Sequence, residues 1–442
     1  MCPRRVGVAW SSLLPKPRGG QMSHGGSRPH IVTGMDVSAN GAKRDSSEGE
    51  GESLVRGLIA ELLDCYPPSS TPTREFLRAR YDAGLAWLWF PPGYGGLGLS
   101  PSLQTLTDRE FAAAGAPNTT VGSIGYMMAG SAIVTYGSEE MKRRYLPMIF
   151  AHEADWVQLF SEPGAGSDLA GLSTRAVRDG DEWVINGQKV WSSGAMRADY
   201  GLLITRSDPD VPKYNGLTAF IIDMHAPGVE VRPLRNMMGT AEFAETFFND
   251  LRVPDESRLG GVNDGWRVTL STLMVERVNF TADFAGAGAP RSDGPMAEAT
   301  RDFLQRGPDV PGRRDEFIKI WTAVQVGRFH NQRVAQAAKT GIPGPEGSIG
   351  KLLSTELTKK VANLAIAIRG PEGMILSQPY PTIGESRVRE DLDPVLALLT
   401  SPSNTIMGGT SEIQRNNIGE RVLGLPREPR MDRDIPWKDV PR

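Results

Sequence analysis

The chain has 442 residues, of which 39% are hydrophobic and 23% charged, so it is long enough for about three domains with buried cores. Its 49 lysines and arginines against 52 acidic residues leave no basic footprint for nucleic acid. Two cysteines exclude a scaffold of several disulfides and a thiolate zinc site, and the five scattered histidines lack metal-binding spacing. No apolar run reaches about 18 residues, so no membrane-spanning helix is expected.

Residues 1–52 are predicted to be a disordered tail or an over-extended start. Glycine and proline interrupt any helix there, which opposes an amphipathic transit peptide, and the apolar stretch 6–14 is short for a signal peptide. Met22 or Met35 is then an alternative initiator. The folded protein is therefore expected to begin near residue 53.

Helical spacing dominates residues 53–154, which predicts an N-terminal helical domain. Ser100 and Pro101 form an N-cap and a first-turn proline that open one helix of this domain. Two more helices are expected over 125–136 and 138–150. The second has acidic residues at its start and basic residues later, an order that suits the helix dipole.

Two glycine motifs in the chain resemble nucleotide-binding loops. Gly93–Gly98 matches G-x-G-x-x-G, but a dinucleotide site needs a βαβ unit that the surrounding pattern lacks. We interpret it as a tight loop between helices. Gly350-Lys351 is not a phosphate-binding loop either, because Pro345 and Leu352 stand where that motif has glycine and a hydroxyl residue.

Short β-rich runs separated by turn residues begin near residue 155. Asn186-Gly187 lies between two such runs and predicts a β-hairpin with a type I′ turn. Closely spaced strands without intervening helices predict an antiparallel barrel or sandwich over residues 155–262. Four further strands are expected, at Tyr200–Thr205, Leu217–Asp223, Val229–Val231 and Ala244–Val253.

Helical patterning returns over residues 263–424, where several long helices predict a bundle, and a C-terminal tail follows at 425–442. The fold class is therefore α+β and multidomain. Its expected chain order is a helical domain, a small β domain and a helical bundle.

Two segments of the β region carry small and hydroxyl-bearing residues that suit a cofactor. Ser161–Asp168 reads SEPGAGSD, and its amides and hydroxyls can approach a ring edge or a phosphate, although an ordinary glycine-rich turn is equally consistent. Trp191–Gly194 adds an indole and two hydroxyls at the end of a strand. The indole could cover a planar cofactor, but such a tryptophan is more often part of a core.

The bundle region carries two further candidates. Glu276 lies in an apolar stripe with Leu273 and Phe280, so it is either a general base with a raised pKa or half of a structural ion pair. The segment 407–415 reads MGGTSEIQR, and its two glycines lead into a capped helix N-terminus. Such a terminus suits a diphosphate or a carbonyl oxygen, but many helix starts bind nothing.

Taken together, these segments resemble the acyl-CoA dehydrogenase family over residues 53–430. The resemblance rests on the Gly93–Gly98 loop, GSEEMKRRYLP at 137–147, SEPGAGSD, NGQKVWSSG, Glu276-Arg277 and GGTSEIQR. It implies an N-terminal helical domain, a middle antiparallel β-barrel and a C-terminal four-helix bundle, assembled as a homodimer or homotetramer. It also implies FAD as cofactor, an acyl-CoA thioester as substrate and electron-transfer flavoprotein as electron acceptor.

The resemblance further implies roles for individual residues. Many members place the catalytic glutamate where this chain has Gly408, whereas isovaleryl- and long-chain-type members place it on the first bundle helix before an arginine, as in Glu276-Arg277. Glu276 is therefore expected to be the catalytic base. The cofactor-binding positions would be Gln158, Phe160, Ser161, Gly166, Ser167, Trp191, Ser193, Thr410 and Glu412. The substrate-binding positions would be Ser167, Arg277, Gly408 and Gly409.

Two departures from the family pattern bear on assembly. Ala299–Ile320 lacks the family's Arg-x-x-Phe-Gly stretch, which reaches the FAD of a neighbouring subunit, and the Gln-x-x-Gly-Gly element is altered at Ala367–Gly373. These losses fit a heteromer with a homologous subunit.

The expected activity is FAD-dependent α,β-dehydrogenation of an acyl-CoA to the 2,3-enoyl-CoA. The alternatives are a half-site or non-catalytic subunit of a heteromeric acyl-CoA dehydrogenase, and a flavin acyl-CoA oxidase. A bacterial cytoplasmic location is expected, with the mitochondrial matrix as the weaker alternative.

Overall fold

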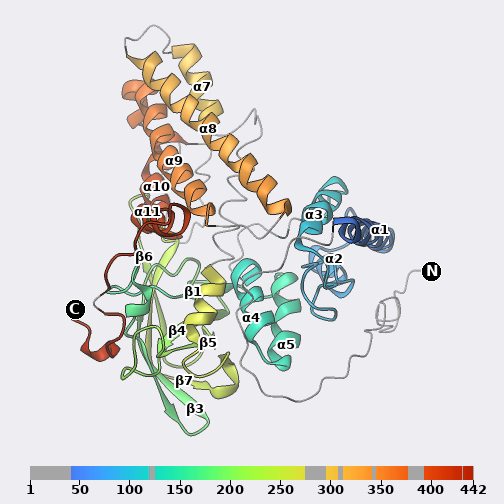
Figure 1. The fold of residues 1–442 in the computed structure, drawn as a ribbon, viewed down its shortest axis with the longest axis vertical. Helices are drawn as coiled ribbons and strands as arrows, with labels where there is room; N and C mark the ends of the chain where they lie inside the picture. The colour runs from blue at the N-terminus through green and yellow to red at the C-terminus, as the bar shows by residue number, and fades with distance from the viewer. Residues whose placement is uncertain are drawn as a thin grey trace. The chain divides into compact units, whose positions relative to one another are not determined.

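The computed structural model describes most of the chain. The described ranges are residues 41–117, 119, 125–273, 295–306, 312–340, 345–376, 393–430 and 432–441. Contacts divide the chain into two compact units, Met1–Val121 with Lys142–Glu153, and Gly122–Met141 with Ala154–Arg442. Figure 1 shows their helices and strands. No helix within the described ranges is long and apolar enough to cross a membrane.

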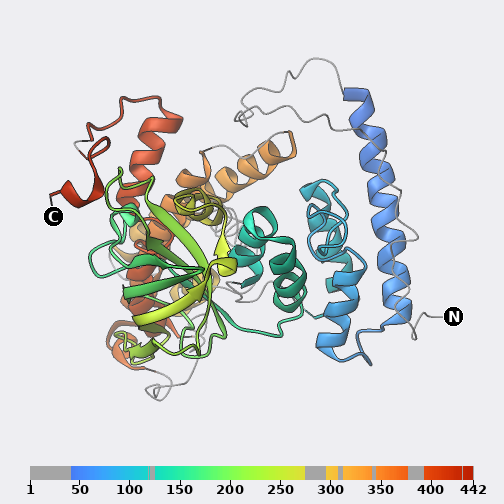
Figure 2. The ribbon, with the colours of Figure 1, turned by 90° about the horizontal axis from the view of Figure 1, so that it is seen from below.

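The first unit is helical. Its helices are α1 (Gly41–Cys65), α2 (Thr73–Asp82), α3 (Gln104–Ala113) and most of α5 (Glu139–Phe150). α1 starts before the expected beginning of the fold near residue 53, and it packs against α3 (Figure 2). Ser100 caps the turn that leads into α3, as predicted, because its Oγ accepts a hydrogen bond from the amide of Ser102 at 3.3 Å.

The Gly93–Gly98 loop packs into the core of this first unit. The amides of Ala86 and Trp87 both donate to the carbonyl of Gly95, at 3.0 Å. Trp87 stacks on Phe90 with the ring centroids 4.7 Å apart. The loop is therefore a tight packing loop between α2 and α3, which confirms the prediction.

The second unit contains one eight-stranded sheet with the strand order β6-β7-β3-β2-β4-β5-β8, and β1 pairs with β4. The four strands predicted between residues 200 and 253 are confirmed. The strands are β1 (Trp156–Leu159), β2 (Arg175–Asp179), β3 (Glu182–Lys189), β4 (Tyr200–Arg206), β5 (Leu217–Asp223), β6 (Val229–Leu234), β7 (Phe243–Pro254) and β8 (Arg258–Leu259).

The predicted antiparallel barrel is not confirmed. The strand path among the described residues ends at β6 and β8 without closing. β1 and β2 also run parallel to β4, so the sheet is mixed. β1 pairs with Tyr200–Leu203 and Arg175 of β2 pairs with Arg206, so both strands follow β4 in the same direction with segment 160–174 between them.

The predicted hairpin at Asn186-Gly187 is wrong, because β3 runs through both residues. Asn186 instead sits at an irregularity between β3 and β7, where its Nδ2 donates to Asp250 Oδ1 at 2.9 Å and its Oδ1 accepts from the Asp250 amide at 3.0 Å. Gly187 has φ 153°, and a Cβ there would lie 2.5 Å from Thr174 Oγ1. The glycine therefore permits a close approach of two segments rather than a turn.

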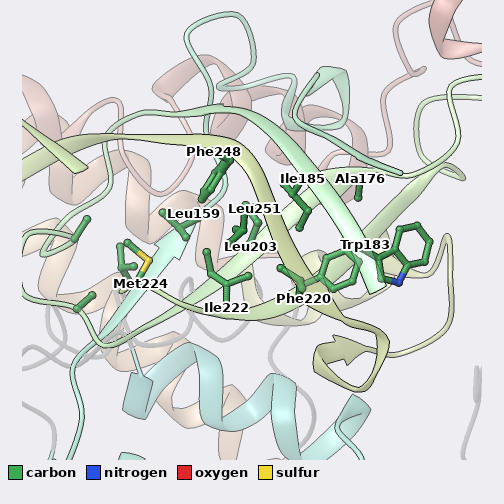
Figure 3. Packing of buried hydrophobic residues seen from close by; sticks show 14 of the residues in the cluster. Leu159, Ala176, Trp183, Ile185, Leu203, Phe220, Ile222, Met224, Phe248 and Leu251 are labelled. Atoms are coloured by element: carbon green, nitrogen blue, oxygen red, sulfur yellow. The ribbon is translucent and has the colours of Figure 1, made fainter. Parts of the chain in front are cut away.

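The strands share a hydrophobic core. Trp183 of β3 meets Phe220 of β5 edge-on, with the ring centroids 5.5 Å apart. Burying a large apolar side chain contributes about 1.5–3 kcal/mol, so this core holds the strands of the sheet together. Figure 3 shows its members from several strands, among them Leu159, Ile185, Leu203, Phe248 and Leu251.

The rest of the second unit is helical. After a helix that is described at 265–273, its helices are α7 (Pro295–Arg306), α8 (Arg313–Thr340), α9 (Gly347–Arg369), α10 (Pro394–Asn404) and α11 (Ser411–Asn417), and the shorter α4 (Gly130–Tyr136) precedes the sheet. α9 packs against α7, α8, α10 and α11 (Figure 1). Phe303 of α7 stacks on Phe317 of α8 with the ring centroids 4.4 Å apart. These helices agree with the predicted bundle.

Candidate functional site

The segment after β1 forms a tight turn that leaves small residues open to solvent. Glu162 and Ala165 exchange two backbone hydrogen bonds of 3.0 Å each. A Cβ placed on Gly164 or Gly166 would meet no atom within 4 Å, and Gly166 and Ser167 are exposed. The turn therefore leaves its backbone accessible at the glycines and presents one hydroxyl beside them.

A buried ion pair fastens this turn to β3. The side chain of Lys189 is 0% exposed, and its Nζ donates to Glu162 Oε1 at 2.8 Å and to the Phe160 carbonyl at 2.9 Å. Glu162 also accepts from the amides of Ser173 at 2.6 Å and Thr174 at 2.9 Å. Burial lowers the pKa of Lys189 to about 8. Burial raises the pKa of Glu162, but Lys189 and the other donors outweigh it and hold that pKa below its usual value.

Trp191 follows β3 in a backbone conformation that non-glycine residues rarely adopt. Its φ is 61°, the residue is 60% exposed, and its ring meets Phe243 edge-on with the centroids 5.9 Å apart. Ser192 is buried, and its amide donates to the Ala244 carbonyl at 3.1 Å, while Ser193 is exposed. Strained residues of this kind cost about 1–3 kcal/mol and concentrate at functional sites.

The structure brings these two β segments together. The amide of Val190 donates to the Ser161 carbonyl at 2.9 Å, so the chain leading to Trp191 runs beside the beginning of the turn. Gln158 lies in β1 and is half-buried, as is Ser161, whereas Phe160 is buried. The exposed indole and hydroxyl groups therefore stand on a buried, hydrogen-bonded support.

The glycine pair before α11 is held by α9. The buried Lys351 donates from Nζ to the carbonyls of Gly409 at 2.7 Å and Asn404 at 3.1 Å. Gln414, which is also buried, donates from Nε2 to the Gly408 carbonyl at 3.3 Å and the Gly409 carbonyl at 3.2 Å. Gly408 and Gly409 have φ of 65° and 93°, which glycine adopts at no steric cost.

Thr410 caps α11, as predicted, because its Oγ1 accepts from the amide of Ile413 at 3.2 Å. Ser411 Oγ donates to Glu356 Oε1 of α9 at 2.7 Å. Glu412 is exposed, and hydrogen bonds from its own amide and from the Thr410 hydroxyl hold its pKa below the usual value. The start of α11 is therefore anchored before any ligand binds.

Glu276 and Arg277, expected as the base and a substrate-binding residue, lie outside the described residues. The helix that would carry them is described at 265–273, and its first residue, Gly265, lies against β5. A Cβ there would be 2.7 Å from the carbonyl of Leu217. The roles of Glu276 and Arg277 stay predictions.

Sequence reasoning did not identify Lys189 or Lys351 as supports of the site. Lys189 is an even number of residues from Trp183 and Ile185 along β3, so its side chain lies on the same buried face. A cation at such a position needs a hydrogen-bond acceptor, and this pattern is a signal that the sequence contains. No comparable signal marks Lys351 on its helix. In the described part of the chain, no group of three or more histidine, cysteine or acidic residues could hold a metal ion.

Comparison with known proteins covers all three regions. Family models described as the N-terminal, middle and C-terminal domains of acyl-CoA dehydrogenase match residues 59–153, 158–251 and 263–423. The chain is 37% identical over 377 residues to the acyl-CoA dehydrogenase FadE34 of Mycobacterium tuberculosis. That match covers 84% of this chain and 49% of FadE34, so the chain spans about half of that relative's length.

Two further comparisons involve proteins of similar length. The chain is 35% identical over 346 residues to the acyl-CoA dehydrogenase IpdE1 of Mycobacterium tuberculosis, which covers 78% of this chain and 86% of IpdE1. It also matches a solved structure, the ChsE4-ChsE5 complex from Mycobacterium tuberculosis, with a TM-score of 0.62 and 29% identity over 89% of this chain and 100% of that chain. From its three matched domains and its identity to IpdE1, the chain belongs to the acyl-CoA dehydrogenase family of oxidoreductases.

Proposed function

We propose that this chain is an FAD-dependent acyl-CoA dehydrogenase that converts an acyl-CoA thioester into the 2,3-enoyl-CoA. Members of the family bind FAD. The observation that carries the proposal is the exposed indole of Trp191, held in a left-handed conformation beside the Ser161–Ser167 turn. An apolar ring next to open amides and hydroxyls fits a flat flavin with a polar edge.

The FAD-binding residues would contact three different parts of the cofactor. Gln158, Phe160, Ser161, Gly166 and Ser167 would lie along the isoalloxazine ring, with Phe160 and Ser161 near its polar edge. Trp191 and Ser193 would cover its other face, and Thr410 and Glu412 would bind the diphosphate and ribose of an FAD shared within a dimer. Bound FAD would supply an acceptor for the substrate's β-hydrogen, taken as a hydride at flavin N5, and the electrons would then pass to electron-transfer flavoprotein.

The remaining chemistry belongs to residues of the chain. The substrate's α-proton is weakly acidic, so the thioester oxygen needs a donor, for which we propose a backbone amide at Gly408 or Gly409. Glu276 would remove the α-proton as general base. Because residue 408 is glycine, no side chain there would block Glu276 from the α-carbon. Arg277 would lie towards the CoA, and Ser167 would contact the thioester arm.

The test is reduction of bound flavin by acyl-CoA without oxygen. Wild-type protein is expected to be yellow and to bleach with at least one member of an acyl-CoA panel that varies chain length, branching and ring content. Glu276→Gln is expected to bind the same acyl-CoA but to lose at least ~10²-fold in reduction rate. Glu316→Gln is the matched control, because Glu316 is exposed on α8. A near-normal rate for Glu276→Gln would remove Glu276 from this role.

The second candidate is a half-site or non-catalytic subunit of a heteromer, and the altered family elements at Ala299–Ile320 and Ala367–Gly373 favour it. Arg369, in the altered Gln-x-x-Gly-Gly element, binds Glu298 at 2.8 Å and Asp302 at 2.6 Å on α7. The two regions that depart from the family pattern therefore hold each other within one chain. Solved relatives include a heteromeric complex, ChsE4-ChsE5.

Purification with and without a homologous partner separates these candidates. Colourless protein that becomes yellow only when co-expressed with a homologue would support the half-site subunit. A homodimer or homotetramer with full FAD occupancy would contradict it. Rapid reoxidation of the reduced flavin by oxygen would instead indicate an acyl-CoA oxidase.

A further inference from the structure

The C-terminal strap, which we define as residues 432–441, returns to the sheet after the helical bundle. The amide of Trp437 donates to the Val211 carbonyl at 2.9 Å, and the amide of Lys438 donates to the Pro209 carbonyl at 3.1 Å. The strap therefore pairs with the connection between β4 and β5. Figure 1 shows this end of the chain, in red, beside the sheet.

Lys213 links the strap to the end of the Ser161–Asp168 turn. Its Nζ donates to both carboxylate oxygens of Asp168, at 2.7 and 2.8 Å, and also to Asp432 of the strap. The Lys213 side chain is 6% exposed, whereas that of Asp168 is 60% exposed. A nearly buried cation thus ties the residue after Ser167 to the strap.

A second link joins the strap to the residues that follow Asp168. The indole N–H of Trp437 donates to the Gly171 carbonyl at 3.2 Å. The buried guanidinium of Arg206 lies 4.8 Å from the centroid of the Trp437 ring and donates to the Ala170 carbonyl at 2.5 Å. Asp168, Ala170 and Gly171 are therefore all held by the strap or by a cation that the strap contacts.

We infer that the strap positions the Ser161–Asp168 turn for FAD, with Asp432 and Trp437 as positioning residues. The inference rests on the proposed FAD-dependent function. Gly164 and Gly166 give the turn conformational freedom that must be lost when a ligand is bound. The Glu162–Lys189 pair restrains the beginning of the turn, and the strap restrains its end. The turn therefore loses less conformational entropy when FAD binds.

The experiment compares strap variants of the full-length protein. Asp432→Asn removes one of the two negative charges that face Lys213, leaves the Asp168 carboxylate in place and keeps the side chain's shape. It is expected to weaken FAD binding to the deflavinated protein about tenfold, the factor expected from a charge-assisted hydrogen bond. It should also speed amide hydrogen exchange in peptides covering 161–171 in the absence of FAD. Asp432→Glu should restore both properties to near the wild-type values.

Two further variants complete the test. Trp437→Phe keeps a ring near Arg206 but removes the bond to Gly171, and it should also weaken FAD binding and speed exchange. Lys438→Ala changes another residue of the strap, where it removes an exposed ion pair with Asp210 of the β4–β5 connection, and it should leave both readouts unchanged.

Unchanged FAD affinity and exchange in Asp432→Asn and Trp437→Phe would overturn the inference. An equal loss in Lys438→Ala would also overturn it, because general loosening of the strap would then explain the effect. Wild-type protein that binds no FAD, alone or with a homologous subunit, would instead refute the proposed function. The exchange measurement would then show only whether the strap orders the turn, and the role of the strap in FAD binding would fall with the proposed function.

Discussion

Replacing Lys189 with methionine is expected to destabilise the second unit by about 3–4 kcal/mol. The change removes two donations from Nζ, to Glu162 and to the Phe160 carbonyl, and it leaves the Glu162 carboxylate with two amide donors at a side chain that is 7% exposed. Protonation of Glu162 limits the cost. Each unit by which the loss of Lys189 raises the pKa of Glu162 corresponds to about 1.4 kcal/mol.

The assay is guanidinium unfolding at pH 7, followed by tryptophan fluorescence of Lys189→Met, Glu162→Gln and the double variant. Each single change breaks the pair, whereas the double change replaces both buried charges. The double variant should therefore recover at least half of the stability that Lys189→Met loses. A loss below about 1 kcal/mol for Lys189→Met, or no recovery in the double variant, would refute the reasoning.

Three further predictions concern pH, packing and capping. Burial lowers the pKa of Lys189 from 10.5 to about 8, so between these values the unfolded chain binds more protons and stability rises with pH. Lys189→Met lacks this gain, so its deficit in unfolding free energy should widen by roughly 1 kcal/mol per pH unit above pH 8. Gly187→Ala should destabilise by at least about 2 kcal/mol in denaturant unfolding, because its Cβ would clash with Thr174. Thr410→Ala should destabilise the start of α11 by about 1 kcal/mol, because the amide of Ile413 loses its hydrogen bond to the Thr410 hydroxyl. The measurement is amide hydrogen exchange, which should become faster at the start of α11.

The features that sequence predicted well depend on neighbouring residues. The strands between 200 and 253 are short runs bounded by turn residues, so their limits could be predicted to within a few residues. The Thr410 cap depends on a hydroxyl and an amide three residues apart. The absence of a βαβ pattern around Gly93–Gly98 likewise correctly indicated a packing loop rather than a dinucleotide site.

The features that sequence missed depend on distant residues. Asn186-Gly187 can form a hairpin turn or continue a strand. Here it continues β3, where Asn186 binds Asp250, 64 residues further on, and Gly187 approaches Thr174 closely. The parallel pairing of β1 with β4 joins residues that are 44 positions apart, such as Trp156 and Tyr200. The local sequence does not distinguish a turn from a continuing strand at Asn186-Gly187, because an asparagine followed by a glycine suits both.

The support of the candidate site follows one physical rule that sequence did not reveal. Lys189 donates to the Phe160 carbonyl, Arg206 to the Ala170 carbonyl and Lys351 to the Gly409 carbonyl, and all three cations are buried. Each carbonyl lies in or beside a glycine-containing segment, where the backbone has the most freedom to lose. A long cationic side chain can reach such a carbonyl from a rigid strand or helix. If the carbonyl moved away, the buried N–H donor would lose its acceptor at a high cost in free energy, and this cost holds the segment in place. Of Lys189 and Lys351, only Lys189 carries a sequence signal of burial, its alternation with Trp183 and Ile185. A lysine in a helix such as Lys351 resembles an exposed residue, so the exposed site residues could be predicted more readily than their supports.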